Sequence, residues 1–341
     1  MKYKGMFKMS GIFPVLGYDI GGTKIGIGLC SSDGKLYGKD RIDNKDTDPD
    51  VILPQLVEKG QQLIDAAGFK NSDIRGLGIS SPSPADIPQG IIVGPPNNPH
   101  WRNVHIKHYL SSKLGIEGFF DNDANAGVLA EWFFGAGKHG RDIVYLTMST
   151  GIGGGIVANG HLIQGKGFYA GEIGHIVLDI NGIKCNCGLQ GCYEAFCGGR
   201  AVAQRMQREL AGQPEHPLVK LAGGKVENLD MVALLEGVRQ HNDYALKLWD
   251  EICLRNAQAF GTIMNLLNPE KIILGTIAIA AGDLFLDPVK KYLPRFAWKE
   301  TMAVCKLVPS ALRHDIGYYA GPAVALNCLY EKGDFALPWR D

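Results

Sequence analysis

The stretch Asp19-Ile20-Gly21-Gly22-Thr23-Lys24 lies between two β-rich runs, Val15 to Ile20 and Thr23 to Cys30. This order predicts two antiparallel strands with the glycine pair at the bend that joins them. Glycine has no Cβ, so the backbone amides of such a bend can approach the oxygens of a phosphate group. A plain tight turn explains the same residues equally well. The stretch is no P-loop, because no Gly-Lys-Ser/Thr motif opens a helix.

A second glycine-rich stretch, Ser149-Thr150-Gly151-Ile152-Gly153-Gly154-Gly155, follows a predicted buried strand from Asp142 to Met148. Glycines are entropically costly to order, so we expect something to approach the backbone of this loop closely. Two such stretches, one in each predicted lobe, could bind one triphosphate from both sides. Asp19 would then orient the water shell of Mg²⁺, which keeps several of its waters in proteins.

The chain has 341 residues, which is enough for two lobes of ordinary size. Helical spacing of apolar residues predicts helices over Asp123 to Phe134 and Asp243 to Leu267. Buried strands are predicted at Ile74 to Ile79 and at Lys271 to Leu274. Strand meanders followed by helices occur twice, which predicts two related α/β lobes with a cleft.

Asp121-Asn122-Asp123 lies where a predicted strand ends and a helix begins. These residue types are good helix N-caps, so a purely structural role stays open. Phosphoryl transfer, however, needs a group that accepts the proton of the attacking hydroxyl, and a carboxylate at a rigid helix start is suited to this. We therefore predict Asp123 as the general base and Asn122 as a ligand of the hydroxyl.

One short segment combines three cysteines with a histidine: His175, Cys185, Cys187 and Cys192. A single residue separates Cys185 from Cys187, a spacing poorly suited to a mutual disulfide. Three thiolates and one imidazole complete a tetrahedral zinc site, although unligated buried thiols stay an alternative. Four protein ligands leave no open position, so such a zinc ion would be structural. It would fix the loop that presents Glu172, His175 and Glu194.

The formal net charge of the chain is zero, which leaves room for a local basic patch but gives no general field. Lys plus Arg and Asp plus Glu both number 35, so no general field attracts nucleic acid or a membrane surface. No apolar stretch approaches the roughly 18 residues of a membrane span. Residues 1–14 read as a short tail without the apolar core of a secretory signal. We expect a cytoplasmic protein with no nucleic-acid and no membrane partner, in which eight cysteines favour metal over disulfides.

The most specific residues are Gly171-Glu172-Ile173-Gly174-His175 and Cys185-Asn186-Cys187-Gly188-Leu189-Gln190-Gly191-Cys192-Tyr193-Glu194. With them the chain resembles the ROK family (repressor, open reading frame, kinase) from about Val15 to near Ala325, and in particular its glucokinase-like sugar kinases. The resemblance implies an α/β fold, namely a two-lobed actin-like ATPase (ribonuclease H-like) fold with a cleft between lobes. It implies a small lobe over 15–121, joined by a C-terminal helix around 320–334, and a large lobe over 122–319 that contains the zinc-binding loop 175–192.

The resemblance also implies an activity, because ROK kinases transfer the γ-phosphate of ATP to a sugar hydroxyl. The implied cofactors are ATP with Mg²⁺ and a structural Zn²⁺, and the implied assembly is a homodimer. Asp123 is similar to the family's catalytic base. The implied substrate-binding residues are Ser83, Asn97, Asn122, Asp123, Glu172, His175 and Glu194. The implied ATP-binding residues are Asp19, Gly21, Gly22, Thr23, Lys24, Ser149, Thr150, Gly151, Gly153, Gly154 and Gly275. One ring nitrogen of His175 would bind zinc while the other faces the sugar.

Three departures bear on specificity. Pro82-Ser83-Pro84 replaces the family's usual Pro-Gly-Pro, His100 replaces a usual glycine, and Gly275-Thr276-Ile277 replaces a run of glycines near the adenosine. The resemblance implies glucose as the hexose, and these departures leave N-acetylmannosamine, N-acetylglucosamine, mannose, fructose and allose as alternatives. A phosphoryl donor other than ATP also stays open.

Two rival functions remain. Many ROK members are sugar-responsive repressors with a helix-turn-helix module ahead of the kinase-like part. The first glycine stretch begins here at Asp19, so we expect no such module. A non-catalytic sugar-binding protein is the second rival, and the presence of Asp123 with both glycine stretches argues against it.

Overall fold

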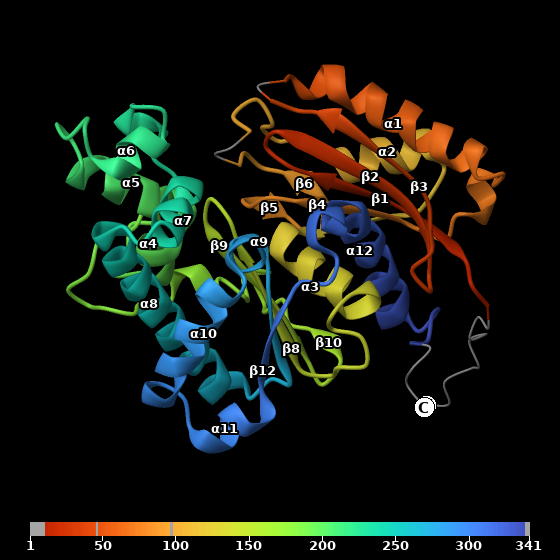
Figure 1. Cartoon of the computed structure of the whole chain (residues 1–341). Helices are drawn as coiled ribbons and strands as arrows, with labels where there is room; N and C mark the ends of the chain where they lie inside the picture. Colours follow the sequence, from red (N-terminus) through yellow and green to blue (C-terminus); the bar gives the residue numbers. More distant parts are fainter. Residues whose placement is uncertain (1–10, 46, 96–97, 338–341) are drawn as a thin grey trace. The chain divides into compact units, whose positions relative to one another are not determined.

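The computed structural model describes residues 11–45, 47–95 and 98–337 (Figure 1). Contacts between Cα atoms divide the chain into two compact units. Unit 1 comprises Met1–Arg141, Asn159–Tyr169 and Ala311–Asp341, and unit 2 comprises Asp142–Ala158 and Ala170–Ser310. The lobe boundaries expected from the family resemblance stay a prediction, and the compact units differ from them by placing residues 122–141, 159–169 and 311–319 in unit 1.

Unit 1 contains a five-stranded sheet in the order β3-β2-β1-β4-β7. Its strands are β1 (Pro14–Ile20), β2 (Lys24–Ser31), β3 (Leu36–Asp43), β4 (Leu77–Ser81) and β7 (Gly118–Asn122). The short β5 (Ala85–Asp86) and β6 (Ile91–Ile92) form a separate two-stranded sheet, and unit 1 also contains the short β10 (His161–Leu162). Its α-helices are α1 (Pro49–Ala66), α2 (Ile106–Leu114), α3 (Asp123–Phe134) and α12 (Ile316–Lys332). β1 pairs antiparallel with β2 and parallel with β4.

The two faces of this sheet differ in side-chain size. On one face, bulky residues such as Leu16, Tyr18 and Ile27 pack with α1 and α2 in a buried core. The other face carries glycines against α12, where a Cβ on Gly28 would lie 1.9 Å from the Tyr318 carbonyl oxygen. Figure 1 shows α1 and α12 on opposite faces of the sheet. The glycines thus allow the backbone of α12 to lie directly on the strands.

Unit 2 contains four strands in the order β9-β8-β11-β12. They are β8 (Ile143–Met148), β9 (Ile152–Ala158), β11 (Lys271–Leu274) and β12 (Lys306–Pro309). The α-helices are α4 (Tyr193–Cys197), α5 (Gly199–Glu209), α6 (Pro217–Leu221), α7 (Met231–Arg239), α8 (Asp243–Leu267), α9 (Thr276–Ala281), α10 (Asp283–Tyr292) and α11 (Lys299–Val304). β8 pairs antiparallel with β9 and parallel with β11, as β1 does with β2 and β4. The two units therefore share this strand arrangement.

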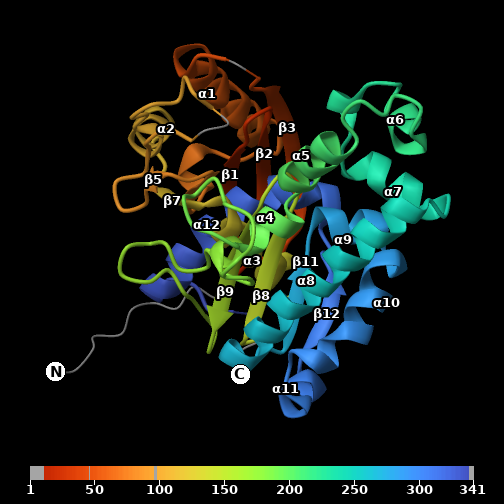
Figure 2. The same cartoon turned by 90° about the vertical axis from the view of Figure 1, so that its left-hand side faces the viewer.

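The core of unit 2 lies between its sheet and its helices. Val144 and Leu146 of β8 belong to one buried cluster with Trp249 and Phe260 of α8 and Phe285 of α10. Figure 2 shows α8 and α10 side by side along this unit. In the part of the chain that the structure describes, no helix is both long and apolar enough to cross a membrane.

Several predicted elements are confirmed at their predicted bounds: α3, α8 and β11. The strand expected at Ile74 to Ile79 is displaced, because β4 begins at Leu77, where parallel pairing with Leu16 of β1 sets its register. The second glycine-rich stretch is a loop only as far as Gly151. From Ile152 onward it belongs to β9, with Gly153 opposite Thr147 of β8.

Candidate active site

The first glycine stretch forms the bend between β1 and β2, as predicted. The Gly21 amide donates to the Lys24 carbonyl oxygen at 3.1 Å. The Gly21 carbonyl oxygen accepts from the side-chain amide of the buried Asn44 at 2.8 Å. Thr23 and Lys24 are exposed. Asn44, which sequence reasoning missed, therefore anchors the inner side of the bend and leaves its outer side accessible.

Asp19 is the last but one residue of β1 and lies on the face of the sheet that α12 covers. Its Oδ1 accepts a hydrogen bond of 2.6 Å from the hydroxyl of the buried Ser80 on β4. A Cβ on Gly317 would lie 2.9 Å from its Oδ2, so this glycine makes room for the carboxylate. Burial among protein atoms raises the pKa of Asp19 to about 6, although the Ser80 hydrogen bond and the Lys24 charge lower it. Asp19 is thus a closely held acid that titrates near pH 6.

The Asp121-Asn122-Asp123 triplet joins β7 to α3. Asn122 is the N-cap, since its Oδ1 accepts from the Asn125 amide at 2.7 Å, so the capping interpretation holds for this residue. Its side-chain NH₂ group is the part able to donate to a ligand. Asp123 begins the helix and is exposed, whereas Asp121 and Asn122 are buried. Of the two acids, Asp123 is therefore the one that can meet a substrate.

Asp121 supports this helix start from within. Its Oδ1 accepts from the Asn122 amide and the Asn125 side chain, both at 2.8 Å. Its Oδ2 accepts from the Gln164 side chain at 2.7 Å. Burial raises the pKa of Asp121 to about 6, against the lowering effect of these hydrogen bonds. Gln164 lies 43 residues further along the chain, so only the fold shows its role.

The second glycine stretch has two parts with different surroundings. Ser149 and Thr150 are exposed, and their carbonyl oxygens accept from the first amides of α5, those of Gly199 and Arg200, each at 2.9 Å. Gly154 is buried, and a Cβ there would lie 2.8 Å from the Gly171 carbonyl oxygen. Ser149 to Gly151 can therefore face a phosphate, while Gly154 has a packing role that we did not anticipate.

The segment from Gly171 to His175 lies against β9, backbone to backbone. A Cβ on Gly174 would be 2.1 Å from the Ile152 carbonyl oxygen. Gly171 has a φ of +92°, which favours glycine, and a Cβ on it would be 2.4 Å from the Gly154 carbonyl oxygen. These contacts fix the backbone on both sides of Glu172, which is exposed.

The four predicted metal ligands come together: the ligand atoms of His175, Cys185, Cys187 and Cys192 all lie within 4.8 Å of one another. The Cys187 and Cys192 sulfurs are 3.7 Å apart, and Cys185 Sγ is 3.9 Å from His175 Nδ1. Thiolates at the usual Zn–S distance of about 2.3 Å in a tetrahedron lie about 3.8 Å apart. The arrangement therefore fits a metal ion with tetrahedral coordination.

The two ring nitrogens of His175 point to different partners. Nδ1 faces the cysteine cluster, while Nε2 lies 4.0 Å from a carboxylate oxygen of Glu172. A histidine that binds a metal through one nitrogen can present the other to a polar ligand. This orientation matches the shared use that the family resemblance implies.

Glu194 connects the cysteine loop to the second glycine stretch. It lies in the first turn of α4, and its Oε2 accepts from the Ile152 amide at 2.7 Å. A Cβ on Gly151 would be 2.4 Å from the same oxygen, so Gly151 allows the carboxylate to approach. One oxygen of Glu194 is thus committed to the protein backbone, a role that local sequence did not reveal.

The remaining predicted residues are placed as follows. Ser83 is half-buried just after β4. Gly275 is the N-cap of α9, and its amide donates to the Leu146 carbonyl oxygen at 2.9 Å. Asn97 lies outside the described residues. Unit 1 therefore brings together Asp19, the first bend and the Asp123 helix start, and unit 2 brings together the second bend, the acids and the cysteine cluster.

Comparison with known proteins gives a family match over most of the chain. The model described as "ROK family" matches residues 15–326. A glucokinase from Thermotoga maritima is 32% identical over 311 residues, which cover 91% of this chain and 96% of that protein. A xylose repressor from Bacillus subtilis is 27% identical over 87% of this chain and 73% of its own length.

Solved structures agree. A ROK hexokinase from Thermus thermophilus superposes with a TM-score of 0.81 at 26% identity, covering 94% of this chain and all of that one (100%). A ROK family glucokinase from Streptomyces griseus in complex with glucose and AMPPNP gives a TM-score of 0.72 at 27% identity, covering 92% and 99% of the two chains. These proteins are similar to this chain over nearly their full lengths.

Proposed function

The chain belongs to the ROK family, and on this premise we propose that it transfers the γ-phosphate of ATP to a hydroxyl group of glucose. The expected two-lobed actin-like ATPase fold is confirmed by the similarity to ROK kinase structures. The observation that carries the proposal is the start of α3, where Asp123 is the exposed carboxylate between a buried cap and a well-packed helix.

In this proposal Asp123 takes the proton of the attacking sugar hydroxyl. Its place at the first position of α3 fixes the carboxylate, and the buried Asp121 and Asn122 hold the turn before it. Glu172, Glu194 and the outer nitrogen of His175 would bind sugar hydroxyls. Positioning and charge neutralisation supply most of the rate in phosphoryl transfer, and a base adds about 10² to 10⁴-fold.

Each bend would bind phosphate oxygens of ATP: Gly21 to Lys24 in unit 1 and Ser149 to Gly151 in unit 2. Asp19 would orient water molecules around Mg²⁺, which neutralises charge on the phosphates when it is bound. The geometry of the cysteine cluster supports zinc, held by His175, Cys185, Cys187 and Cys192. With all four positions taken by protein, this ion would brace the loop and leave the chemistry to Asp123.

Glucose is favoured by the glucokinases among the relatives. A coupled assay of ADP release with glucose, N-acetylmannosamine, N-acetylglucosamine, mannose, fructose and allose tests the choice. We expect glucose to give the highest kcat/KM. A higher value for another hexose would reassign the substrate and retain the kinase.

A non-catalytic sugar sensor is the second candidate, favoured by the xylose repressor among the relatives. Calorimetric titration with glucose separates the two functions. Tight sugar binding without any sugar-stimulated ADP release would support the sensor. We also expect a homodimer, which light scattering on the purified protein would test.

A further inference from the structure

The two ends of the cysteine loop lie side by side in unit 2. Residues 176–179 follow His175, and they pair with residues 191–193 at the other end of the loop. The Leu178 amide donates to the Gly191 carbonyl oxygen at 2.8 Å, and Val177 forms a β-bridge with Cys192. A Cβ on Gly191 would lie 1.6 Å from the Asp179 carbonyl oxygen. The loop is therefore closed at its base by direct backbone contact.

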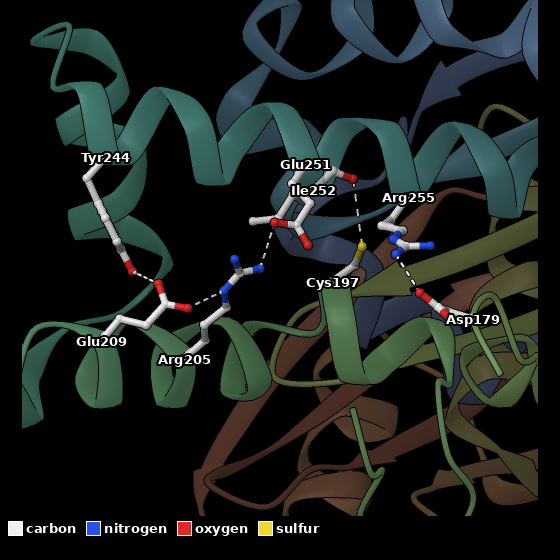
Figure 3. A network of polar contacts seen from close by, with 8 residues as sticks. All are labelled: Asp179, Cys197, Arg205, Glu209, Tyr244, Glu251, Ile252 and Arg255. Carbon is white, nitrogen blue, oxygen red and sulfur yellow. Dashed lines mark hydrogen bonds and ion pairs between the residues drawn. The ribbon is translucent and has the colours of Figure 1, made fainter. Parts of the chain in front are cut away.

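Arg255 on α8 touches both sides of this base. Its Nη2 lies 3.0 Å from Asp179 Oδ2, on the segment that follows His175 (Figure 3). Its guanidinium carbon lies 4.5 Å from the ring centroid of Phe196 on α4, the helix that follows Cys192. A planar guanidinium can make both contacts at once, since its edge donates hydrogen bonds while its face stacks on an aromatic ring.

The neighbouring residues of α8 extend this attachment. Arg255 Nη1 donates to the Gln258 side chain at 3.2 Å, and Gln258 donates to the Leu178 carbonyl oxygen at 2.9 Å. One turn of α8 therefore holds residues 176–179 through the Asp179 side chain and through the Leu178 carbonyl oxygen. On the α4 side, the buried Tyr193 hydroxyl donates to the side chain of the buried Asn256.

We propose that Arg255 is a positioning residue, which locks the base of the cysteine loop to α8 and thereby sets the metal ligands and Glu194. The inference rests on the proposed zinc site and sugar site. His175 lies four residues before Asp179, and Glu194 lies two residues before Phe196 on the same short helix. Loss of the guanidinium would remove one side-chain contact from each side of the base at once.

Arg205 provides a matched control within the same unit. Like Arg255 it is a mostly buried arginine, with its side chain 25% exposed against 22%. It forms an ion pair with Glu251 of α8 at 2.9 Å and a second with Glu209, both drawn in Figure 3. The Glu251 pair joins α5 to α8 and the Glu209 pair lies within α5, so neither partner belongs to the cysteine loop. Arg205→Ala therefore removes an equivalent arginine without touching the proposed brace.

The test measures the rate at which zinc leaves the purified zinc-loaded protein for a chromogenic chelator in excess. Residues that orient metal ligands typically change metal affinity by about 10 to 100-fold when they are replaced. Because Arg255 acts through the loop base, we expect Arg255→Ala to speed zinc release by about 10-fold, the low end of that range. Arg205→Ala should release zinc at the wild-type rate.

Conservative variants and steady-state kinetics complete the test. Arg255→Lys keeps a charge but loses the planar fork, so it should release zinc nearly as fast as Arg255→Ala. Arg255→Ala should raise the KM for glucose while lowering kcat much less, because Asp123 is untouched. Asp179→Asn removes the charged partner and keeps the arginine, so it should also speed zinc release. This variant provides the test if Arg255→Ala fails to fold.

The outcomes separate this inference from the proposed function. Zinc release from Arg255→Ala and Asp179→Asn at the rate of Arg205→Ala would overturn the role of Arg255 and leave the zinc site and the kinase standing. A wild-type protein that retains no zinc after loading would remove the proposed metal site and this inference with it. ADP release with glucose would still report on the kinase.

Discussion

Asp123 and Asp243 occupy the same position in two helices. Comparing their variants therefore separates a catalytic role of Asp123 from its effect on the helix start. Each is the first residue of its helix and each is exposed. Each follows an asparagine N-cap whose Oδ1 accepts from the backbone three residues on, at 2.7 Å in α3 and 3.0 Å in α8. Both carboxylates gain the same stabilisation from the helix dipole. A difference between their variants therefore reports on chemistry.

We predict that Asp123→Asn lowers kcat by about 10² to 10⁴-fold and changes sugar affinity little, because only proton transfer is lost. Asp243→Asn, the matched variant, should keep kcat within about two-fold. Steady-state kinetics with glucose and a glucose titration give both quantities. Near-normal turnover in Asp123→Asn would remove this residue from the role of base.

Ser80 tunes the acid that would orient the Mg²⁺ waters. The pKa of Asp19 is about 6, mainly through burial, and the hydrogen bond from Ser80 lowers it. As pH falls through that value, Asp19 gains a proton and loses the charge that the Mg²⁺ waters need. Activity that depends on this charge should therefore be present above about pH 6 and fall below it.

We predict that Ser80→Ala shifts the acidic limb of the kcat/KM profile for MgATP to higher pH, because the carboxylate loses a hydrogen bond that favours its charged form. Ser81→Ala is the matched control, since the buried Ser81 donates to the Pro82 carbonyl oxygen and not to Asp19. Rates measured from pH 5 to pH 8 in both variants test this. An unmoved limb in Ser80→Ala would show that Asp19 does not set it.

At the scale of elements, the sequence predicts the bounds of a helix where an N-cap residue, a terminating glycine and helical spacing of apolar residues occur together. α3 runs from Asp123 after its asparagine cap to Phe134 before Gly135, as the sequence predicts. The second glycine stretch was harder to predict, because Gly153 and Gly154 already belong to β9. Gly154 lacks a side chain because Gly171 packs against it, a contact 17 positions away that no local pattern records.

Some residues of the candidate site could likewise be predicted from the sequence, and others could not. Residues in short motifs, such as the cysteines and Asp123, could be predicted from the chain, partly through the family resemblance. Ser80, Gln164 and Arg255 could not, because their partners are 61, 43 and 76 residues away. Such supporting contacts depend on strand register and helix packing, and only the folded structure brings them together.

The cysteine loop is the element whose stability we expect to depend on metal. Cys187→Ser removes one of four ligands, so zinc content should fall from about one ion per chain toward zero after dialysis with a chelator. The KM for glucose should rise about 10-fold or more as Glu172, His175 and Glu194 lose their support. Cys305→Ser, a buried cysteine of unit 2 outside the cluster, should keep its zinc. Full activity in metal-free protein would contradict the structural role.

At the scale of the whole molecule, each unit has a glycine-containing bend after the first strand of a similar strand arrangement. The returning helix, expected around 320–334, is α12 at Ile316–Lys332, and the glycines of β1, β2 and β4 admit its backbone. The sequence could predict the two related halves from their repeated order of elements. The sequence could not predict which sheet face would receive α12. Glycines on the strands meet the backbone of α12 there, and such a contact leaves no periodic pattern of apolar residues.

The central claim is that these parts together phosphorylate a hexose. The most direct measurement incubates the zinc-loaded protein with glucose and MgATP and analyses the products by mass spectrometry. We predict phosphorylated glucose and ADP in equal amounts, with product formation reduced about 10² to 10⁴-fold in Asp123→Asn. Unchanged ATP and no sugar phosphate, from protein that still binds glucose, would contradict the account.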